Sequence, residues 1–369
     1  EDGEVGNGFY VWSGADSTVV VDGYVGNDSE VDASGDVEWS HHEQTWTSDG
    51  LTTLSTLDKS GTTVGTGVAS VTIGATGQID GYLEIEAFGG STTTVSGNIA
   101  DYLSVDTTGT NTATSTANTY DPATLDTTYA FSVTRDAAGG ASVVDIKAGG
   151  SIDGSVSVEA DGSITYTNAG VQGGDVSLDS VRTLRVSEYT DKSHSTALPG
   201  GGVVVTTDIN NTGYADKAVG DAVSFTNTSL VGPLGANVTI DALGDVTIVN
   251  SGTVRGTTDA SSFGQDSSSD TADKTVTTFT PGATPPEDVT ETVRTITDTD
   301  TVDFVGGSVT GTYSGANGTT NFSPSADGSI TQQPNSNSTA TISGSVYGNL
   351  SSETMDKGFN SAARVTIST

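Results

Sequence analysis

Short alternating runs constrain the fold of this chain more than any other feature. In many stretches, Val, Ile, Thr and Tyr alternate with polar residues, which is the pattern of a half-buried β-strand. The clearest runs are 17–21, 68–73, 82–85, 129–133, 143–146, 183–186, 246–249 and 364–367. Gly, Asn and Asp fill almost every gap between these runs, as expected of turns. Helical periodicity is weak, with 351–364 the one candidate for a short helix, so the sequence predicts an all-β fold.

Composition alone would also fit a disordered chain. Hydrophobic residues make up only 33% of the sequence and aromatic residues 6%, and such a chain buries little apolar surface. Disorder, however, does not explain why the β-branched residues alternate so regularly with polar ones. The order of the residues therefore favours a folded, strand-rich protein.

The charge balance is strongly acidic. Asp and Glu number 47 against 12 Lys and Arg, which gives a formal net charge of -35. Such a chain is not expected to bind nucleic acid, because the phosphate backbone is itself an anion. Copies of the chain also repel one another, so any assembly needs salt screening, divalent cations or strong backbone pairing.

An internal repeat organises the chain. Its clearest copy, VSVEADGSITYTNAG, begins at Val156, and a second, VTIDALGDVTIVNSG, begins at Val238. Shorter copies begin at Val71 (VTIGATGQI) and Phe322 (FSPSADGSIT), so the four starting points are almost evenly spaced along the chain. We interpret each copy as a hairpin with a glycine in its turn, where a positive φ would explain the glycine. These turn glycines are Gly77, Gly162, Gly244 and Gly328.

A repeat of about 83 residues suits a small β-sandwich, and it also suits several coils of a β-solenoid. We favour sandwich-like antiparallel units, because solenoids usually show a period of about 20 to 30 residues and none is evident. The predicted parts are an N-terminal segment (1–59), repeats at 60–147, 148–229 and 230–311, and a partial fourth repeat with the C-terminal strand (312–369). Within the third repeat, 257–303 is rich in Thr, Asp and Pro and predicts an exposed loop or extension.

All three tryptophans, Trp12, Trp39 and Trp46, lie in the N-terminal segment. Clustered tryptophans indicate either a distinct hydrophobic core or an exposed docking surface. Of the two, we expect an ordinary core.

The segment ADGSITYTN, from Ala160 to Asn168, resembles a hairpin of the tandem immunoglobulin-like and cadherin-like repeats in large microbial surface adhesins. The composition, with no cysteine and abundant Thr, Gly and Asp, is similar to that of subunits of microbial sheaths, surface layers and extracellular filaments. These resemblances imply an extracellular protein at the cell surface. The start at Glu1, with Met355 the single methionine, fits removal of a secretion signal, although a chain trimmed by another protease would start the same way. No apolar run approaches the roughly 20 residues that span a bilayer.

Carboxylates close together in loops suggest bound calcium, which takes oxygen ligands. The candidate metal ligands are Asp298, Asp300 and Asp303, then Asp153 and Asp161, then Asp241 and Asp245. Solvated loop acids are the simpler interpretation of each group. The Asn-X-Ser/Thr pattern marks candidate glycosylation sites at Asn27, Asn210, Asn227, Asn237, Asn317, Asn321, Asn337 and Asn349.

Catalytic signatures are absent from the sequence. His41 and His42 are adjacent, so in a strand they point to opposite faces and cannot hold one metal ion from one side, and His194 lies in a polar stretch. None of the motifs GxSxG, GxxxxGK[ST], GxGxxG or HExxH occurs. Acids are too evenly spread to single out a glycosidase pair. We expect the protein not to be an enzyme.

These observations favour a structural subunit of an extracellular assembly, such as a sheath, surface layer or filament, in which strands pair between copies of the chain. The run 364–367 is a candidate for such pairing. The main alternative is an adhesin or glycan-binding surface module, whose partners are glycans or the cell envelope. A phage tail fibre or depolymerase is a third interpretation.

Overall fold

The computed structural model describes residues 4–46, 54–121, 126–197, 204–232, 236–280, 289–314, 329–334, 337–342, 349–352 and 362–367. These residues form strands, turns and bends without any helix, which confirms the all-β prediction. Each of the eight alternating runs lies in or overlaps a strand. The helix candidate 351–364 begins in one strand and ends in another, and 353–361 lie outside the described residues.

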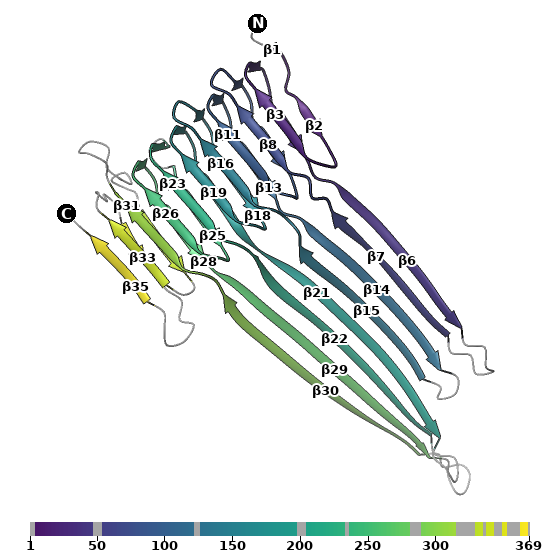
Figure 1. The fold of residues 1–369 in the computed structure, drawn as a ribbon. Coiled ribbons are helices and arrows are strands. Elements are labelled where there is room, and N and C mark those ends of the chain that lie inside the picture. The colour runs from purple at the N-terminus through teal and green to yellow at the C-terminus, as the bar shows by residue number, and fades with distance from the viewer. Residues whose placement is uncertain are drawn as a thin grey trace.

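Most of the strands belong to three parallel sheets, here named A, B and C (Figure 1). Sheet A contains β1 (Glu4–Val5), β4 (Tyr24–Val25), β9 (Gln78–Ile79), β12 (Asn98–Ile99), β17 (Ser151–Ile152), β20 (Val171–Gln172), β24 (Leu230–Val231) and β27 (Thr253–Val254). Sheet B contains β2 (Tyr10–Trp12), β5 (Ser29–Asp32), β10 (Leu83–Glu86), β13 (Leu103–Thr107), β18 (Val156–Ala160), the beginning of β21 (Val176–Ala197), β25 (Val238–Ala242), β28 (Thr258–Ser262), β32 (Ser329–Pro334) and β34 (Asn349–Ser352). Sheet C contains β3 (Ser17–Val21), β8 (Ala69–Ile73), β11 (Ser91–Val95), β16 (Ser142–Ile146), β19 (Ile164–Asn168), β23 (Val223–Asn227), β26 (Val246–Asn250), β31 (Val309–Tyr313), β33 (Asn337–Ile342) and β35 (Ala362–Ile367).

From β3 to β28 the chain visits the sheets in the repeating order C, A, B, so each circuit is one coil of a parallel β-solenoid. Inward side chains alternate with outward ones, as in β8, where Ala69, Val71 and Ile73 are buried. Equivalent positions in successive coils then stack on one another. In sheet A, for example, Val25, Ile79, Ile99 and Ile152 are all buried and in register. These stacks form one continuous hydrophobic core through the solenoid.

This architecture corrects our preference for sandwich-like antiparallel repeats. The solenoid alternative is the one observed, because neighbouring strands within sheets A, B and C are all parallel. The single core also differs from the separate cores that sandwich units would have. The parallel ladders cross every boundary between the predicted parts, and positions 60, 230 and 312 fall inside β7, β24 and β31.

Four long hairpins leave the solenoid between sheet B and sheet C and pair into an antiparallel sheet, here named the hairpin sheet (Figure 1). Its strands, in spatial order, are β6 (Asp36–Trp46), β7 (Leu54–Val64), β14 (Thr110–Asp121), β15 (Asp126–Ala137), β21 from Val181 onward, β22 (Val204–Gly220), β29 (Gly264–Thr280) and β30 (Val289–Val305). In the predicted loop or extension 257–303, the described residues lie almost entirely in β28, β29 and β30, so these parts are an extension made of strands, and 281–288 lie outside the described residues.

Strand spacing explains why the hairpins occur in every second coil. Neighbouring strands lie about 4.8 Å apart, so two coils advance about 9.6 Å along the solenoid. One hairpin contributes two strands and is equally wide. Hairpins inserted at every second coil therefore meet edge to edge and pair, as β7 does with β14 and β22 with β29.

The same arithmetic explains the long repeat of the sequence. Where no hairpin is inserted, one sheet C strand follows the last closely in the chain, as Ser91 follows Ala69 and Val246 follows Val223. These steps lie within the period of about 20 to 30 residues that is usual for solenoids. The two clearest repeat copies are equivalent, because each is a sheet B strand followed directly by a sheet C strand. The repeat is thus two coils plus one hairpin.

The two shorter repeat copies do not fit this scheme in the same way. The copy at Val71 joins sheet C to sheet A, so it is not equivalent to the copies at Val156 and Val238. The copy at Phe322 begins outside the described residues. Of the four copies predicted from the sequence, two are therefore structurally equivalent in the described residues, namely those that begin at Val156 and Val238.

The repeated glycines serve close packing rather than positive φ. Positive φ occurs at other glycines, such as Gly90 and Gly149, and not at Gly77, Gly162 or Gly244. A Cβ atom on Gly77 would lie 2.1 Å from the carbonyl oxygen of Val21 in the preceding coil. Cβ atoms on Gly162 and Gly244 would lie 2.8 and 2.7 Å from backbone nitrogens of the neighbouring coil. Our turn-conformation argument was therefore wrong for these three, and Gly328 lies outside the described residues.

Candidate functional site

A row of carboxylates runs along the outer face of sheet B, and we name it the carboxylate ladder. Its members occupy the same register position in six successive coils: Asp32, Glu86, Asp106, Glu159, Asp179 and Asp241. Each follows an inward hydrophobic residue at the end of a sheet B strand. Coil stacking therefore places like charges about 4.8 Å apart at the backbone.

Some ladder residues also shape the chain locally. Asp32 and Asp106 accept hydrogen bonds from the backbone N–H two residues later, at 2.8 and 2.7 Å, just before the chain leaves for a hairpin. Asp179 does the same with Val181 at 2.9 Å. Such Asx turns are a common use of aspartate. These turns give Asp32, Asp106 and Asp179 a local role at the three hairpin exits, whereas Glu86, Glu159 and Asp241 lie in coils without a hairpin.

The ladder is electrostatically strained. Partial burial and the neighbouring charges of Asp32 and Asp106 raise the pKa of Glu86. Partial burial and the charges of Asp106 and Asp179 likewise raise the pKa of Glu159. Because burial and like charge both oppose ionisation, the folded protein carries this row at a cost at neutral pH. Protonation, screening salt or a bound cation would relieve the cost.

We expect the variant Glu86→Gln/Glu159→Gln to be more stable than the parent at pH 7, by no more than about 1 kcal/mol in total, because solvent screens the repulsion between these partly exposed side chains. A folded pKa above the unfolded value contributes stability that is present at low pH and is lost as pH rises through the folded pKa. The difference in Tm between variant and parent should therefore be positive at pH 7 and vanish near about pH 4. Thermal unfolding followed by circular dichroism across this range measures it. Glu188→Gln, on the hairpin sheet, is the control, and an equal gain there would contradict the ladder explanation.

The hairpin sheet presents tyrosines on one of its two faces, which we name the tyrosine face. Tyr120, Tyr129, Tyr189 and Tyr214 lie on β14, β15, β21 and β22. Tyr120 pairs with Thr127, two residues before Tyr129, and Tyr189 pairs with Phe131, two residues after it. Tyr189 in turn pairs with Thr212, two residues before Tyr214. Each ring is thus displaced from the last by one strand and two residues, so the four form a diagonal line on one face.

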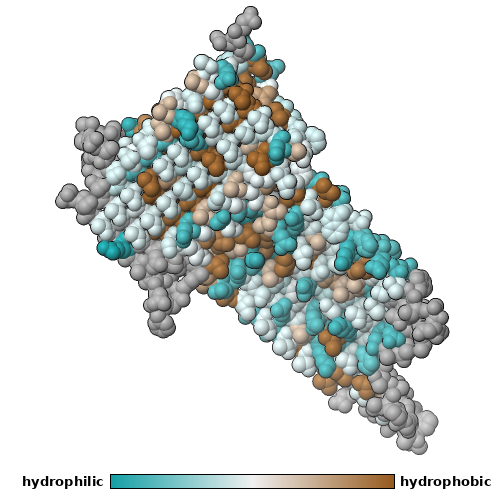
Figure 2. Space-filling view, in the orientation of Figure 1, coloured by the Kyte–Doolittle hydropathy of each residue, from teal (hydrophilic) through white to brown (hydrophobic). Residues whose placement is uncertain are grey.

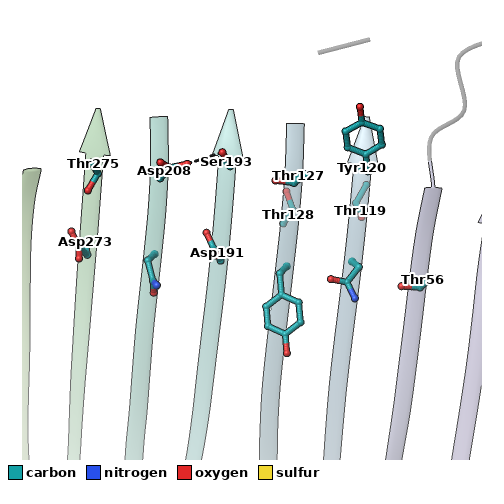
Figure 3. A pocket seen from close by; sticks show the side chains of 13 residues that line it. Thr56, Thr119, Tyr120, Thr127, Thr128, Asp191, Ser193, Asp208, Asp273 and Thr275 are labelled. Carbon is teal, nitrogen blue, oxygen red and sulfur yellow. Dashed lines mark hydrogen bonds between the residues drawn. The ribbon is translucent and has the colours of Figure 1, made fainter. Parts of the chain in front are cut away.

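A groove of about 570 Å³ lies at the Tyr120 end of this line. Figure 3 shows its floor, in which Asp191, Asp208 and Asp273 lie on three neighbouring strands and Tyr120 stands at the far side. Ser193 donates a hydrogen bond to Asp208 at 2.6 Å. Asn118 and Asn210 also line the groove. The groove therefore combines aromatic rings with amide, hydroxyl and carboxylate groups.

Arginines neutralise two of the aspartates on this face. Arg185 binds Asp216 through two nitrogens at 2.6 and 2.5 Å and lowers the pKa of that carboxyl. Arg294 does the same to Asp273, with its closest contact at 2.5 Å. Figure 2 shows strongly hydrophilic side chains gathered over the hairpin sheet, while near-white, weakly polar ones cover much of the solenoid.

The outer strands of the hairpin sheet form two further surfaces. Among the described residues, β6 pairs only with β7 in this sheet and β30 only with β29. β30 is 17 residues long and carries exposed Val293, Ile296, Val302 and Phe304. A long open edge with exposed β-branched residues is a template for pairing with another strand.

The candidate metal ligands do not converge on one point. Asp298 and Asp300 share one face of β30, while Asp303 lies on the other. Asp161 is buried and bound to Arg182, and Asp153 is exposed on a different turn. Asp241 belongs to the carboxylate ladder and accepts a hydrogen bond from Ser261, whereas Asp245 accepts one from the backbone of Ser308. Within the described ranges, no three acidic or histidine side chains form a group that could hold one metal ion.

The candidate glycosylation sites differ in accessibility. Asn227 is fully buried in a ladder of amides, donating to Asn250 at 3.0 Å and accepting from Asn168 at 3.0 Å. A glycan at Asn227 is incompatible with this position, so that prediction is corrected. Asn27 is exposed, and Asn210 and Asn237 are half-buried. Asn337 and Asn349 lie in β33 and β34, and Asn317 and Asn321 lie outside the described residues.

The tryptophans and histidines are surface residues where their side chains are described. Trp12 is 66% exposed and Trp39 is 37% exposed, so the predicted N-terminal tryptophan core is wrong for these two. His42 pairs with Asp58 and His194 with Asp126, both on the hairpin sheet. His41 and His42 occupy successive positions of β6 and so point to opposite faces, as predicted.

Neither the carboxylate ladder nor the tyrosine face was predicted from the sequence. The ladder had a signal, because a hydrophobic residue followed by Asp or Glu recurs at 32, 86, 106, 159, 179 and 241, and the step from 86 to 106 equals that from 159 to 179. The tyrosine face had none, because its four rings come from strands whose register only the folded sheet defines. In the part of the chain that is described, no helix is long and apolar enough to cross a membrane.

Comparisons with known proteins found no match: no family model, no curated protein and no solved structure resembles this chain significantly.

Proposed function

We propose that this protein is a structural subunit of an extracellular assembly, such as a sheath, surface layer or filament, in which hairpin sheets of neighbouring copies pair edge to edge. The observation that carries the proposal is the open edge of β30, which extends over 17 residues. Its outward backbone groups offer hydrogen bonds to a second strand, and backbone pairing needs no reactive side chain.

A second copy of β30 is the partner that this edge suits. Two β30 strands that pair antiparallel are related by a two-fold axis, so each presents the same surface to the other. Because the strands run in opposite directions, the two solenoids would lie at opposite ends of the joined sheet. Repeating the contact at β6, the other open edge, would extend the pair into a filament.

Charge sets the conditions for this assembly. β30 carries Glu291, Asp298, Asp300 and Asp303 against a single Arg294. Two β30 edges therefore repel at low ionic strength, and salt or Ca²⁺ should promote their association. The carboxylate ladder provides a second place where cations such as Ca²⁺ would offset repulsion, through pairs of neighbouring acids. Extracellular fluids rich in salt suit both requirements.

Proline substitutions in β30 test the proposal. In an edge strand the N–H groups of adjacent residues point alternately to the partner strand and to solvent. Of Ile296→Pro and Thr297→Pro, one therefore removes an outward N–H and leaves the pairing with β29 intact, while the other breaks it. We expect the parent to form oligomers or filaments in about 1 to 10 mM Ca²⁺ or about 0.5 M NaCl, and the variant with unchanged Tm to stay monomeric.

Light scattering after gel filtration and negative-stain microscopy provide the measurement. A parent that remains monodisperse through both titrations would remove the assembly proposal. A thermally unaffected proline variant that still assembles like the parent would show that β30 is not the contact. The second proline variant serves as a control for the general effect of proline on the hairpin.

A further inference from the structure

The tyrosine face has a property that edge pairing does not use, namely a line of aromatic rings beside a polar groove. Among the described exposed tyrosines, Tyr120, Tyr129 and Tyr214 are 39%, 36% and 42% exposed. Each step along the line covers one strand spacing and two residues of strand length, or about 8 Å between Cα atoms, so the backbone positions of the four tyrosines span about 25 Å. This length suits an extended chain rather than a single small molecule.

Three of the four rings are held in place before any ligand arrives. Tyr129 and Tyr189 meet edge to face with their centroids 5.8 Å apart, and Asn210 Nδ2 donates to the Tyr189 hydroxyl at 3.1 Å. The Arg185 guanidinium lies 4.7 Å from the Tyr214 ring centre and is itself fixed by its two contacts with Asp216. A binding surface whose side chains are already ordered loses little entropy on binding.

The chemistry of the face fits a sugar. The electron-rich face of an aromatic ring attracts the partly positive C–H groups on the flat side of a sugar ring. Asn118, Asp191 and Asp208 line the groove and offer amide and carboxylate groups to it, and sugar hydroxyls both donate to and accept from such groups. A sugar ring has apolar C–H groups on its flat side and hydroxyl groups at its edge. Tyrosine rings can pack against the first, and the neighbouring polar side chains can bind the second.

The net charge narrows the class of sugar. At -35 the protein repels polyanions, which disfavours sulfated or uronic acid polymers. The pairing of Asp216 with Arg185 and of Asp273 with Arg294 removes two negative charges from the face, so it is less suited to a polycation than the overall charge suggests. We propose that the tyrosine face binds an extended neutral polysaccharide, with its sugar rings stacked along the line from Tyr120 to Tyr214.

Affinity electrophoresis of the full chain tests this binding, with mannan, laminarin, xylan and dextran as neutral probes, heparin as a polyanion and polylysine as a polycation. We expect at least one neutral polymer to retard the protein, with little change in about 0.5 M NaCl. Tyr129→Ala and Tyr214→Ala should each weaken that binding by about 10-fold. Tyr129→Phe should retain most of it, because the ring remains.

Tyr10→Ala is the matched control, since Tyr10 is 61% exposed but lies on sheet B of the solenoid. Retardation by none of the neutral polymers would overturn the proposal, and so would losses no larger than that of Tyr10→Ala. Retardation by polylysine alone, abolished by salt, would identify a nonspecific acidic surface instead. The monomeric proline variant of β30 should bind as the parent does, so this result stands or falls independently of the assembly proposal.

Discussion

Replacing Asp161 by alanine is expected to destabilise the protein by about 3 to 5 kcal/mol, because it leaves a partly buried guanidinium without its partner. Asp161 lies in the turn between β18 and β19, and its side chain is 2% exposed. It accepts hydrogen bonds from Arg182 Nε at 2.5 Å and Nη2 at 2.7 Å. It also accepts backbone N–H bonds from Gly109 at 3.0 Å and Gly139 at 2.8 Å.

These contacts tie three parts of the molecule together. Gly109 and Gly139 flank the hairpin of β14 and β15, while Arg182 lies where β21 leaves the solenoid. Arg182 also donates to the Gly109 carbonyl at 2.6 Å. Loss of Asp161 should therefore weaken the turn between β18 and β19 and also remove contacts at the points where two hairpins leave the solenoid. Urea unfolding of the parent and of Asp161→Ala measures the change in the free energy of unfolding.

Asp216→Asn is the matched control, because Asp216 also binds an arginine through two nitrogens but the arginine of that pair is 59% exposed. Solvent screens such a pair, so its loss should cost no more than about 1 kcal/mol. Similar losses in the two variants would contradict a special role for Asp161. If Asp161→Ala does not fold, Asp161→Asn should give an intermediate loss, because an amide oxygen at the Oδ2 position can still accept from the N–H groups of both Gly109 and Gly139.

The second large effect is expected at Asn227, in the middle of the buried amide ladder. Its Nδ2 donates to Asn250 Oδ1 at 3.0 Å and to the Ser229 carbonyl at 3.2 Å, and its Oδ1 accepts from Asn168 Nδ2 at 3.0 Å. Asn227→Ala would leave Asn168 and Asn250 buried with one partner fewer each. Each of the three hydrogen bonds named above contributes about 1 kcal/mol, so we expect a total loss of about 3 kcal/mol.

Thermal and urea unfolding at a fixed pH measure this loss. The control is Asn27→Ala, since Asn27 carries the same sequence pattern but is exposed, and it should change stability by less than about 0.5 kcal/mol. An Asn227→Ala variant as stable as Asn27→Ala would mean that the ladder contributes nothing to the fold. Mass spectrometry of the proteolytic peptides of the natural protein should show that Asn227 carries no glycan, whatever the state of the exposed sites.

The local pattern of residues predicted the strands well, because alternation is a property of neighbouring residues. The run 17–21 coincides with β3, and the run 246–249 lies in β26. The choice between sandwich and solenoid failed for a definite reason. The short coil period, visible between β23 and β26, is interrupted at every second coil by a hairpin, so only the sum of two coils and a hairpin remained visible as a repeat.

The prediction of a positive φ at the repeated glycines was wrong for a related reason. A repeated glycine is consistent both with a positive φ and with close approach of another backbone, and the sequence does not distinguish them. At Gly162 the second cause applies, because Gly140 and Ala141 of the neighbouring coil occupy the space that a Cβ atom would need.

By itself the sequence determined that this chain is built of short strands, that its turns recur, and that its surface is strongly acidic, since all three follow from residue types and their immediate order. Only the tertiary structure decided which strands pair. Stacking of coils brought six carboxylates into one row from positions as distant in the chain as Asp32 and Asp241. Pairing of separate hairpins likewise brought four tyrosines into one line, because register between distant strands is set by the core beneath them and by the equal widths of two coils and one hairpin.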